Sequence, residues 1–396
     1  MNVLRSRLAL SACAAAASLA ACSGGASAPP FAPVTSLTPS RAPSAHAKHA
    51  VGLGKLLATK NGGQVFGFDI DRNGTDGVLA TASDVETFDQ NSGTITKSFP
   101  KKLPPGTSYA MDAIFAGDVA LITRFVVPTG QIYAKRFYDV MNPVTKGKFT
   151  NAWTSPIRDV NVQAAGPNQV TSTDALFAIE LKKQDKPVII VSDVAKNTVS
   201  KVIHLDPNLF GVGNDPQFGQ DATTNQAIIA LSPDGGAVGG DPPLNVIVDL
   251  TTGKETRFNG LNNGFFHAGD VNGLAVDSTT GIAATTTELN AQVEFYNLAQ
   301  QTGIAAQLPC TSDTSQINSG SGIANDPVNG LFLVTETYYA CGSGSALVVY
   351  DEKGNNVETI TGFKFAIGEP PPAINPATRT GWAFGPGFNQ LQQFFY

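Results

Sequence analysis

The chain has 396 residues, of which 15% are charged and 42% are hydrophobic, and its formal net charge is −6 at pH 7. Its 40 glycines and 25 prolines are typical of an all-β globular protein with many turns rather than of a disordered chain. Lysine and arginine form no cluster, which argues against nucleic acid as a partner and against direct adhesion to anionic lipid, because both need basic patches.

The first residues have the pattern of an export signal. Arg5 and Arg7 form a basic start, and the apolar run 8–21 is shorter than the roughly 20 residues that a membrane span needs. The run ends in Leu19-Ala-Ala-Cys22, which resembles the lipobox of bacterial lipoproteins. The resemblance implies that residues 1–21 are a signal peptide and that Cys22 is lipidated. It also implies an exported, lipid-anchored protein of the cell envelope, at the periplasmic face or the cell surface; an ordinary cleaved signal is the alternative.

Residues 22–48 are mostly alanine, serine, proline, threonine and glycine. Such a segment cannot bury enough apolar surface to offset the entropy lost on ordering. We therefore expect a disordered tether that holds the folded domain, residues 49–396, away from a membrane.

The folded domain repeats a strand that ends in aspartate or asparagine and is followed by a turn, most often with glycine. The end residues are Asp89, Asp139, Asp193, Asp249, Asn297 and Asp351, separated by 50, 54, 56, 48 and 54 positions. A second short strand with its own polar turn precedes the later copies, at 273–281, 322–330 and 373–381. A period of about 50 residues is typical of the blades of a β-propeller.

At these residues the chain resembles the repeat propellers of the NHL, YVTN and SMP-30/lactonase kind, whose blades have a similar innermost hairpin. The resemblance covers residues 65–396 and is clearest from 221 onward. It implies an all-β fold of the β-propeller kind. The six landmark residues plus the final strand 391–396 predict a single propeller of seven blades. The last blade lacks one strand, and we expect the N-terminal strand 51–57 to supply it and close the ring. Such propellers include enzymes and binding modules, so the fold leaves the function open.

The connections between the expected strands are of two kinds. Those that join the first strand of a blade to the second, or the third to the fourth, are tight, as at 73–74 and 252–253. The others leave the opposite face, which we call the long-loop face, and they include 206–220, 259–269, 308–321, 337–345 and 364–371. Because functional residues concentrate on loops held by a rigid scaffold, we expect any site on the long-loop face.

The candidate residues on this face are aromatic, acidic or histidine. The candidates for ligand binding are Phe265, Phe266, Tyr338, Tyr339, Glu369 and Phe388. The aromatic pairs can stack on a sugar or a peptide, and the alternative is that they wedge blades together. The candidates for catalysis are Glu288, Glu336, His267 and Asp270.

Glu288 and Glu336 occupy corresponding places at the ends of second strands in neighbouring blades. Two carboxylates that face one channel can hold a metal or act as acid and base. Equivalent positions in repeats match without any shared role, however, and we expect both side chains to be solvated. We also expect His267, near Asp270, to be a hydrogen-bonded loop residue rather than a base.

Asp69, Asp71, Asn73 and Asp76 follow the spacing with which a calcium loop begins. The twelfth position of that loop is Ala80, where an EF-hand has a bidentate glutamate. An ordinary hairpin rich in turn residues is the alternative. Calcium is the one cofactor that the sequence suggests.

Four cysteines are present, and Cys13 lies within the signal. Cys22 is the expected lipid site. Only Cys310 and Cys341 lie in the folded domain, and we expect both on its long-loop face. An even pair in an exported protein predicts a disulfide between them.

The sequence contains none of the motifs typical of a serine nucleophile, a zinc peptidase, a phosphate-binding loop or haem attachment. We therefore expect a membrane-tethered binding or scaffolding propeller, whose long-loop face takes a protein, a peptide or a glycan. The alternative is a metal-dependent hydrolase of the lactonase type with its site at the central channel, which the resemblance and Glu288, Glu336 and Asp270 favour.

Overall fold

The computed structural model of the protein describes nineteen stretches of the chain, all after residue 50. They are 51–72, 74–81, 83–100, 107–116, 119–127, 135–141, 149–154, 160–161, 174–181, 186–193, 198–206, 217–221, 223–231, 244–258, 271–287, 292–309, 319–337, 345–364 and 371–396. All of them belong to the second of two compact units, Pro39–Tyr396. Every element in these stretches is a β-strand. A membrane-crossing helix is not found among them.

The strands form seven four-stranded antiparallel sheets, in six of which each strand pairs with the next along the chain. The first three are β2 (Val65–Ile70), β3 (Asp76–Thr81), β4 (Asp84–Asp89) and β5 (Thr94–Pro100); β6 (Thr107–Ala116), β7 (Val119–Val127), β8 (Lys135–Met141) and β9 (Phe149–Thr154); and β10 (Val160–Asn161), β11 (Asp174–Leu181), β12 (Lys186–Asp193) and β13 (Thr198–His204). The next three are β14 (Gln217–Asp221), β15 (Gln226–Leu231), β16 (Leu244–Asp249) and β17 (Glu255–Phe258); β18 (Val271–Asp277), β19 (Ile282–Thr287), β20 (Gln292–Asn297) and β21 (Thr302–Gln307); and β22 (Ser319–Asp326), β23 (Leu331–Thr337), β24 (Ser345–Asp351) and β25 (Asn356–Phe363). The expectation of an all-β repeat fold is confirmed.

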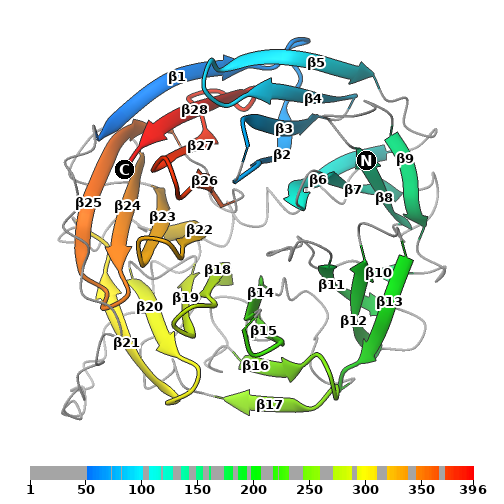
Figure 1. Cartoon of the computed structure of the whole chain (residues 1–396), viewed down its shortest axis with the longest axis vertical. Helices are drawn as coiled ribbons and strands as arrows, with labels where there is room; N and C mark the ends of the chain where they lie inside the picture. The colour runs from blue at the N-terminus through cyan, green and yellow to red at the C-terminus, as the bar shows by residue number, and fades with distance from the viewer. Residues whose placement is uncertain are drawn as a thin grey trace, which may run out of the picture. The chain divides into compact units, whose positions relative to one another are not determined.

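The seventh sheet joins segments from the two ends of the described chain. Its order is β1-β28-β27-β26, with β1 at Gly52–Ala58, β26 at Ala373–Asn375, β27 at Thr380–Phe384 and β28 at Gln390–Phe395. β1 pairs antiparallel with β28, from Gly52 opposite Phe395 to Ala58 opposite Gln390. Figure 1 shows β1 in blue alongside the red β28. The segment 51–57 therefore supplies a strand to the last sheet, as the strand count suggested.

The aspartates and asparagines of the repeat fix its tight turns. Asp249 Oδ1 accepts hydrogen bonds from the backbone N–H groups of Thr251 and Thr252, at 2.8 and 2.7 Å, and Asp277 Oδ1 accepts one from Thr279 at 2.7 Å. The same bond forms at Asp89, Asp221, Asn297, Asp326, Asp351 and Asn375. These side chains satisfy backbone donors that the turn would leave unpaired, so their recurrence has a structural cause.

A residue with positive φ completes several of these turns. Gly253 and Gly281 have φ of 77° and 71°, each four residues after the capping aspartate. Asn225, Gln301 and Arg379 have φ between 52° and 55° at the same place in other turns. The left-handed conformation favours glycine and tolerates asparagine, so the turn geometry explains why glycine recurs in the repeat.

Neighbouring sheets pack face to face through aromatic and aliphatic side chains. Phe295 of β20 meets Phe332 of β23 edge-on, with ring centroids 5.5 Å apart. Phe363 of β25 lies 6.1 Å from Phe394 of β28 in the same way. In the next interface Phe68 of β2 lies 5.3 Å from Phe384 of β27. Because offset and edge-on aromatic pairs add to the stability gained by burial, these contacts hold successive sheets in a fixed arrangement.

Candidate interaction face

The tight turns of neighbouring sheets lie together at one end of the strands. Asn329, in the turn between β22 and β23, donates from Nδ2 to the carbonyl oxygen of Pro376, in the turn between β26 and β27, at 3.2 Å. Asn325 donates from Nδ2 to Asp277 Oδ2, which lies at the corresponding turn of the sheet before, at 3.3 Å. Side chains of the repeat motif therefore form hydrogen bonds between the tight turns of neighbouring sheets.

The other connections meet at the opposite end of the strands, which is the long-loop face. The N–H of Val65, at the start of β2, donates to the carbonyl oxygen of Phe388, in the turn between β27 and β28, at 2.8 Å. The N–H of Lys60, in the connection from β1 to β2, donates to both carboxylate oxygens of Glu86 at 3.1 Å. Backbone N–H groups near the start of β2 thus bond to a backbone carbonyl of one sheet and to a side-chain carboxylate of another.

Phe388 is the predicted binding residue that the structure describes, and its side chain is 61% exposed. The backbone around it is held by the bond from Val65 and by a 3.0 Å bond from the N–H of Thr59 to the carbonyl oxygen of Asn389. An exposed aromatic ring on a fixed backbone loses little conformational entropy when it binds. The other predicted residues of this face, Phe265, Phe266, His267, Asp270, Glu288, Tyr338, Tyr339 and Glu369, lie outside the described residues.

Glu336 is buried, so the expectation of a solvated side chain is wrong. It lies in β23 opposite Ala346 with 0% of its surface exposed. It shares its face of the strand with Phe332 and Val334, which pack against the sheet β18–β21. Neither carboxylate oxygen has a hydrogen-bond partner among the described residues. Burial raises the pKa of Glu336 to about 8, because a low-dielectric environment disfavours the charged form.

Glu294 of β20 is also a buried glutamate, and it was not predicted as a site residue. It is 1% exposed, and its carboxylate oxygens also find no hydrogen-bond partner in the described part of the chain. Burial raises its pKa to about 10. The signal in the sequence is its position three residues before the repeat's Asn297, where the equivalent residues of two other sheets are Val246 and Val348. A glutamate at a position that is valine in two other sheets is the one sign in the sequence that this acid is buried.

Glu86 occupies the position equivalent to Glu294 in the sheet β2–β5, three residues before Asp89. It is also buried, but its carboxylate accepts the two bonds from the N–H of Lys60. Burial raises the pKa of Glu86, and the backbone donor opposes that shift. Of these two equivalent glutamates, the structure gives a donor to Glu86 and none that it describes to Glu294.

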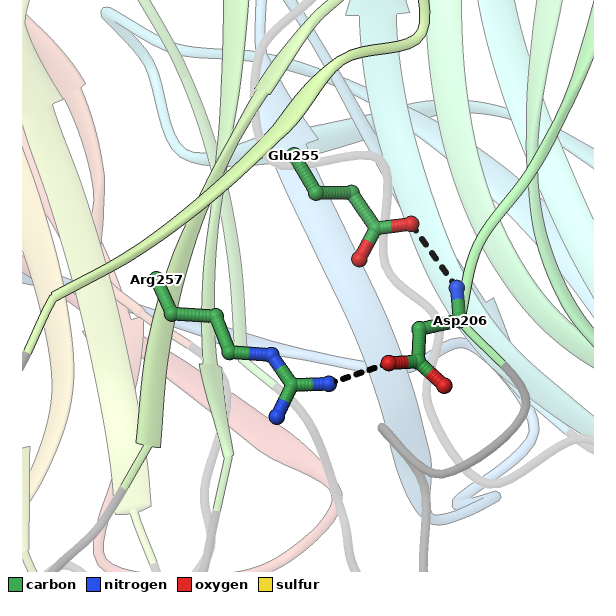
Figure 2. Close-up of polar contacts among 3 residues, drawn as sticks. All are labelled: Asp206, Glu255 and Arg257. Carbon is green, nitrogen blue, oxygen red and sulfur yellow. Dashed lines mark hydrogen bonds and ion pairs between the residues drawn. The ribbon is translucent and has the colours of Figure 1, made fainter.

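Asp206, Glu255 and Arg257 hold the root of the long connection that begins after β13. The N–H of Asp206 donates to Glu255 Oε1 at 2.8 Å, and Arg257 Nη2 donates to Asp206 Oδ2 at 2.5 Å (Figure 2). Glu255 and Arg257 lie in β17, so the cluster joins the segment just after β13 to the outermost strand of the next sheet. The Asp206–Arg257 ion pair is largely exposed, and exposed pairs stabilise a fold by about 1 kcal/mol or less.

The predicted calcium loop contains a hairpin whose centre is occupied by a side-chain amide. Gln90 Nε2 donates to the carbonyl oxygens of Asp71 and Asp76, at 2.7 and 2.8 Å. Burial and the nearby carboxylates of Asp71 and Asp89 raise the pKa of Asp76. Asn73 lies outside the described residues, and no metal-binding group of three is found within the described ranges. The structure shows the hairpin, and calcium binding by Asp69, Asp71, Asn73 and Asp76 stays a prediction.

The predicted disulfide and lipidation sites lie outside the described residues, which contain none of Cys22, Cys310 and Cys341. Both modifications stay predictions from the sequence.

Comparison with known proteins supports the fold and assigns no family. No protein family and no curated protein matches the chain. Chains of solved structures do match, and one belongs to a structure titled "Crystal Structure of Mitotic Checkpoint Complex". Its TM-score is 0.60 and its identity 11%, and the match covers 93% of this chain and 99% of that chain. Likeness at this identity concerns the fold alone: the protein has a propeller-like β fold.

Proposed function

We propose that the seven sheets form a closed seven-bladed β-propeller. The pairing of β1 with β28 supports closure, since it joins the first strand to the last sheet. The contacts between successive sheets support the blade arrangement. A closed ring covers the edges of the sheets that would otherwise pair with other chains.

The propeller acts as a protein-interaction or scaffold module through its long-loop face. The observation that carries this proposal is Phe388, an aromatic ring that is 61% exposed on a turn fixed by backbone hydrogen bonds. Exposed aromatic anchors on rigid backbone are typical of the centres of protein interfaces. The neighbour in fold comes from a structure named as a complex, which is consistent with a propeller that binds protein.

One of the three acidic residues on which the hydrolase alternative depends is buried. Glu336 packs among apolar side chains instead of standing in solvent, while Glu288 and Asp270 lie outside the described residues. The burial of Glu336 therefore favours the binding function over the hydrolase.

The location of the module is a separate proposal, which rests on the sequence. Leu19-Ala-Ala-Cys22 and the segment 22–48 favour export and a lipid anchor on Cys22, with the propeller held at the cell envelope. Mass spectrometry of the native protein tests it: the proposal predicts a mature N-terminus at a lipidated Cys22, and an unmodified N-terminus elsewhere contradicts it.

Site-specific crosslinking tests the binding face. A photoreactive residue is placed at 388 in one variant and at 328 in another, because Val328 is 58% exposed in a tight turn at the opposite end of the strands. The proposal predicts a discrete protein adduct from position 388 in cells of the source organism and none from position 328. An adduct from position 328 alone, or equal adducts from both, contradicts the assignment of the face.

A further inference from the structure

Two glutamates sit between sheets without a counter-charge. Glu294 and Glu336 are 1% and 0% exposed, and none of their carboxylate oxygens has a hydrogen-bond partner within the described residues. An ionised carboxylate without a partner is among the most costly groups to bury, whereas the neutral acid costs far less. Burial without a partner therefore favours the uncharged state at both positions.

Glu294 faces the sheet β14–β17. Along β20 the side chains alternate, so Glu294 and Tyr296 share one face, while Val293 and Phe295 share the other. Tyr296 packs with Ile228 and Ala230 of β15, Leu274 and Val276 of β18 and Ala283 of β19. Within β18–β21 the residues opposite Glu294 are Thr285 and Ala305. Tyr296 is the titratable group of this cluster. Asp221 lies on the face of β14 that also carries Gly219, which is next to Leu274 and Val276.

Glu336 faces the sheet β18–β21 from the other side. It lies opposite Ala346 on the face of β23 that carries Phe332 and Val334. These residues belong to a hydrophobic cluster with Val348 of β24, Val293 and Phe295 of β20 and Ala284 of β19. Tyr350 of β24 is the titratable group of this cluster, and its hydroxyl donates to the carbonyl oxygen of Gln307 at 3.2 Å. Proximity to Glu336 adds to the burial that raises the pKa of Tyr350. The described part of the cluster contains no cation.

We propose that Glu294 and Glu336 form a pH-sensitive device in the fold, in which two neutral carboxylic acids allow the sheet β18–β21 to pack against both neighbours at acidic and neutral pH, and their ionisation loosens that packing at alkaline pH. Both residues lie next to connections of the long-loop face: Glu336 is the penultimate residue of β23, and Glu294 is the third residue of β20. The ends of strands that lead into these connections are therefore the first parts to respond.

The sign of the effect follows from the proton balance. In the unfolded chain both groups have the ordinary glutamate pKa of 4.5, and burial raises the pKa of the folded state to about 8 for Glu336 and about 10 for Glu294. Well above pH 4.5 and well below pH 8 the folded chain holds both protons and the unfolded chain holds neither. Unfolding then releases about two protons, so its equilibrium constant rises about tenfold per pH unit for each of them. Stability contributed by these groups is greatest below pH 4.5 and is lost as pH rises.

The experiment measures unfolding of the full-length chain by denaturant from pH 5.5 to 7.5. We compare the wild type with Glu294→Gln and Glu336→Gln, in which a neutral amide replaces the acid. Glu358→Gln on β25 is the matched control, since this glutamate is partly exposed. The proposal predicts that each of the first two changes removes about one of the protons released on unfolding. The equilibrium constant of unfolding then rises about tenfold less per pH unit than in the wild type. The control should leave the pH dependence unchanged. An unchanged pH dependence in both glutamine variants overturns the proposal.

Infrared spectroscopy of the wild type tests the protonation of Glu294 and Glu336 even where a glutamine variant fails to fold. Two protonated carboxylic acids in the folded wild type give a carbonyl absorption at pH 7 that solvated carboxylates do not give. The proposal predicts this band in the wild type and its disappearance on unfolding at the same pH. A folded wild type without the band at pH 7 overturns it.

Discussion

The hydroxyl of Tyr396 donates a 2.9 Å hydrogen bond to Asp326 Oδ2. Tyr396 is the last residue of the chain, and Asp326 ends β22 in the sheet that precedes its own. Both side chains are buried. Burial and the Asp326 carboxylate together raise the pKa of Tyr396, so the phenol stays a donor at any physiological pH. The bond fastens the C-terminal strand to a turn of the neighbouring sheet.

We expect Tyr396→Phe to lower the free energy of unfolding by about 1–3 kcal/mol, because a buried carboxylate loses one of its donors. Tyr350→Phe is the matched change, since that hydroxyl donates to the neutral carbonyl oxygen of Gln307. It should cost about 1 kcal/mol or less. Denaturant titration of both variants checks the pair, and equal losses would show that the charge on Asp326 adds nothing.

Leu56 and Leu57 are neighbours on β1 with opposite environments. Leu57 is 3% exposed and belongs to a cluster with Leu391, Phe384 and Trp382, whereas Leu56 is 46% exposed. We expect Leu57→Ala to destabilise the fold by about 2–5 kcal/mol through the cavity it leaves. Leu56→Ala should stay within about 0.5 kcal/mol of the wild type. Thermal unfolding of the two variants measures how firmly β1 is packed, and a negligible loss for Leu57→Ala would mean that β1 is not part of the core.

Gly281 isolates the cost of a left-handed turn, since its φ is 71° and nothing lies within 4 Å of an added Cβ. We expect Gly281→Ala to destabilise by about 1–2 kcal/mol through backbone strain alone. Gly281→Asn should cost less, because Asn225 already takes this conformation at the corresponding turn of β14 and β15. Equilibrium unfolding compares the two, and a larger loss for asparagine than for alanine would contradict the explanation.

The repeat was predictable because its spacing reflects local chemistry. Aspartate or asparagine followed by glycine specifies a turn through short-range hydrogen bonds, as at Asp249 and Gly253. Such local bonds can be predicted from a single sequence. The strand 51–57 was predictable as the partner of the last sheet because a strand count leaves one vacancy. Both inferences depend on pattern and arithmetic rather than on contacts between distant residues.

The environment of each glutamate was not predictable, because it depends on which face of a strand meets the next sheet. Glu336 is the penultimate residue of a buried strand, so the same residue type and spacing fit a solvated side chain or a buried acid. Glu86 and Glu294 hold equivalent positions in their sheets, yet only Glu86 receives donors from the described chain, at the N–H of Lys60. The cluster of Asp206, Glu255 and Arg257 joins residues about fifty positions apart. No local sequence pattern predicts such a contact.

Amide hydrogen exchange of the protein, alone and bound to the partner captured by crosslinking, tests the assignment of the binding face most directly. The account predicts that binding slows exchange in residues 59–65 and 385–390, which surround Phe388 on the long-loop face. It predicts no change in the tight turns 326–330 and 351–355 at the opposite end. Protection of those tight turns with no protection around Phe388 would contradict it.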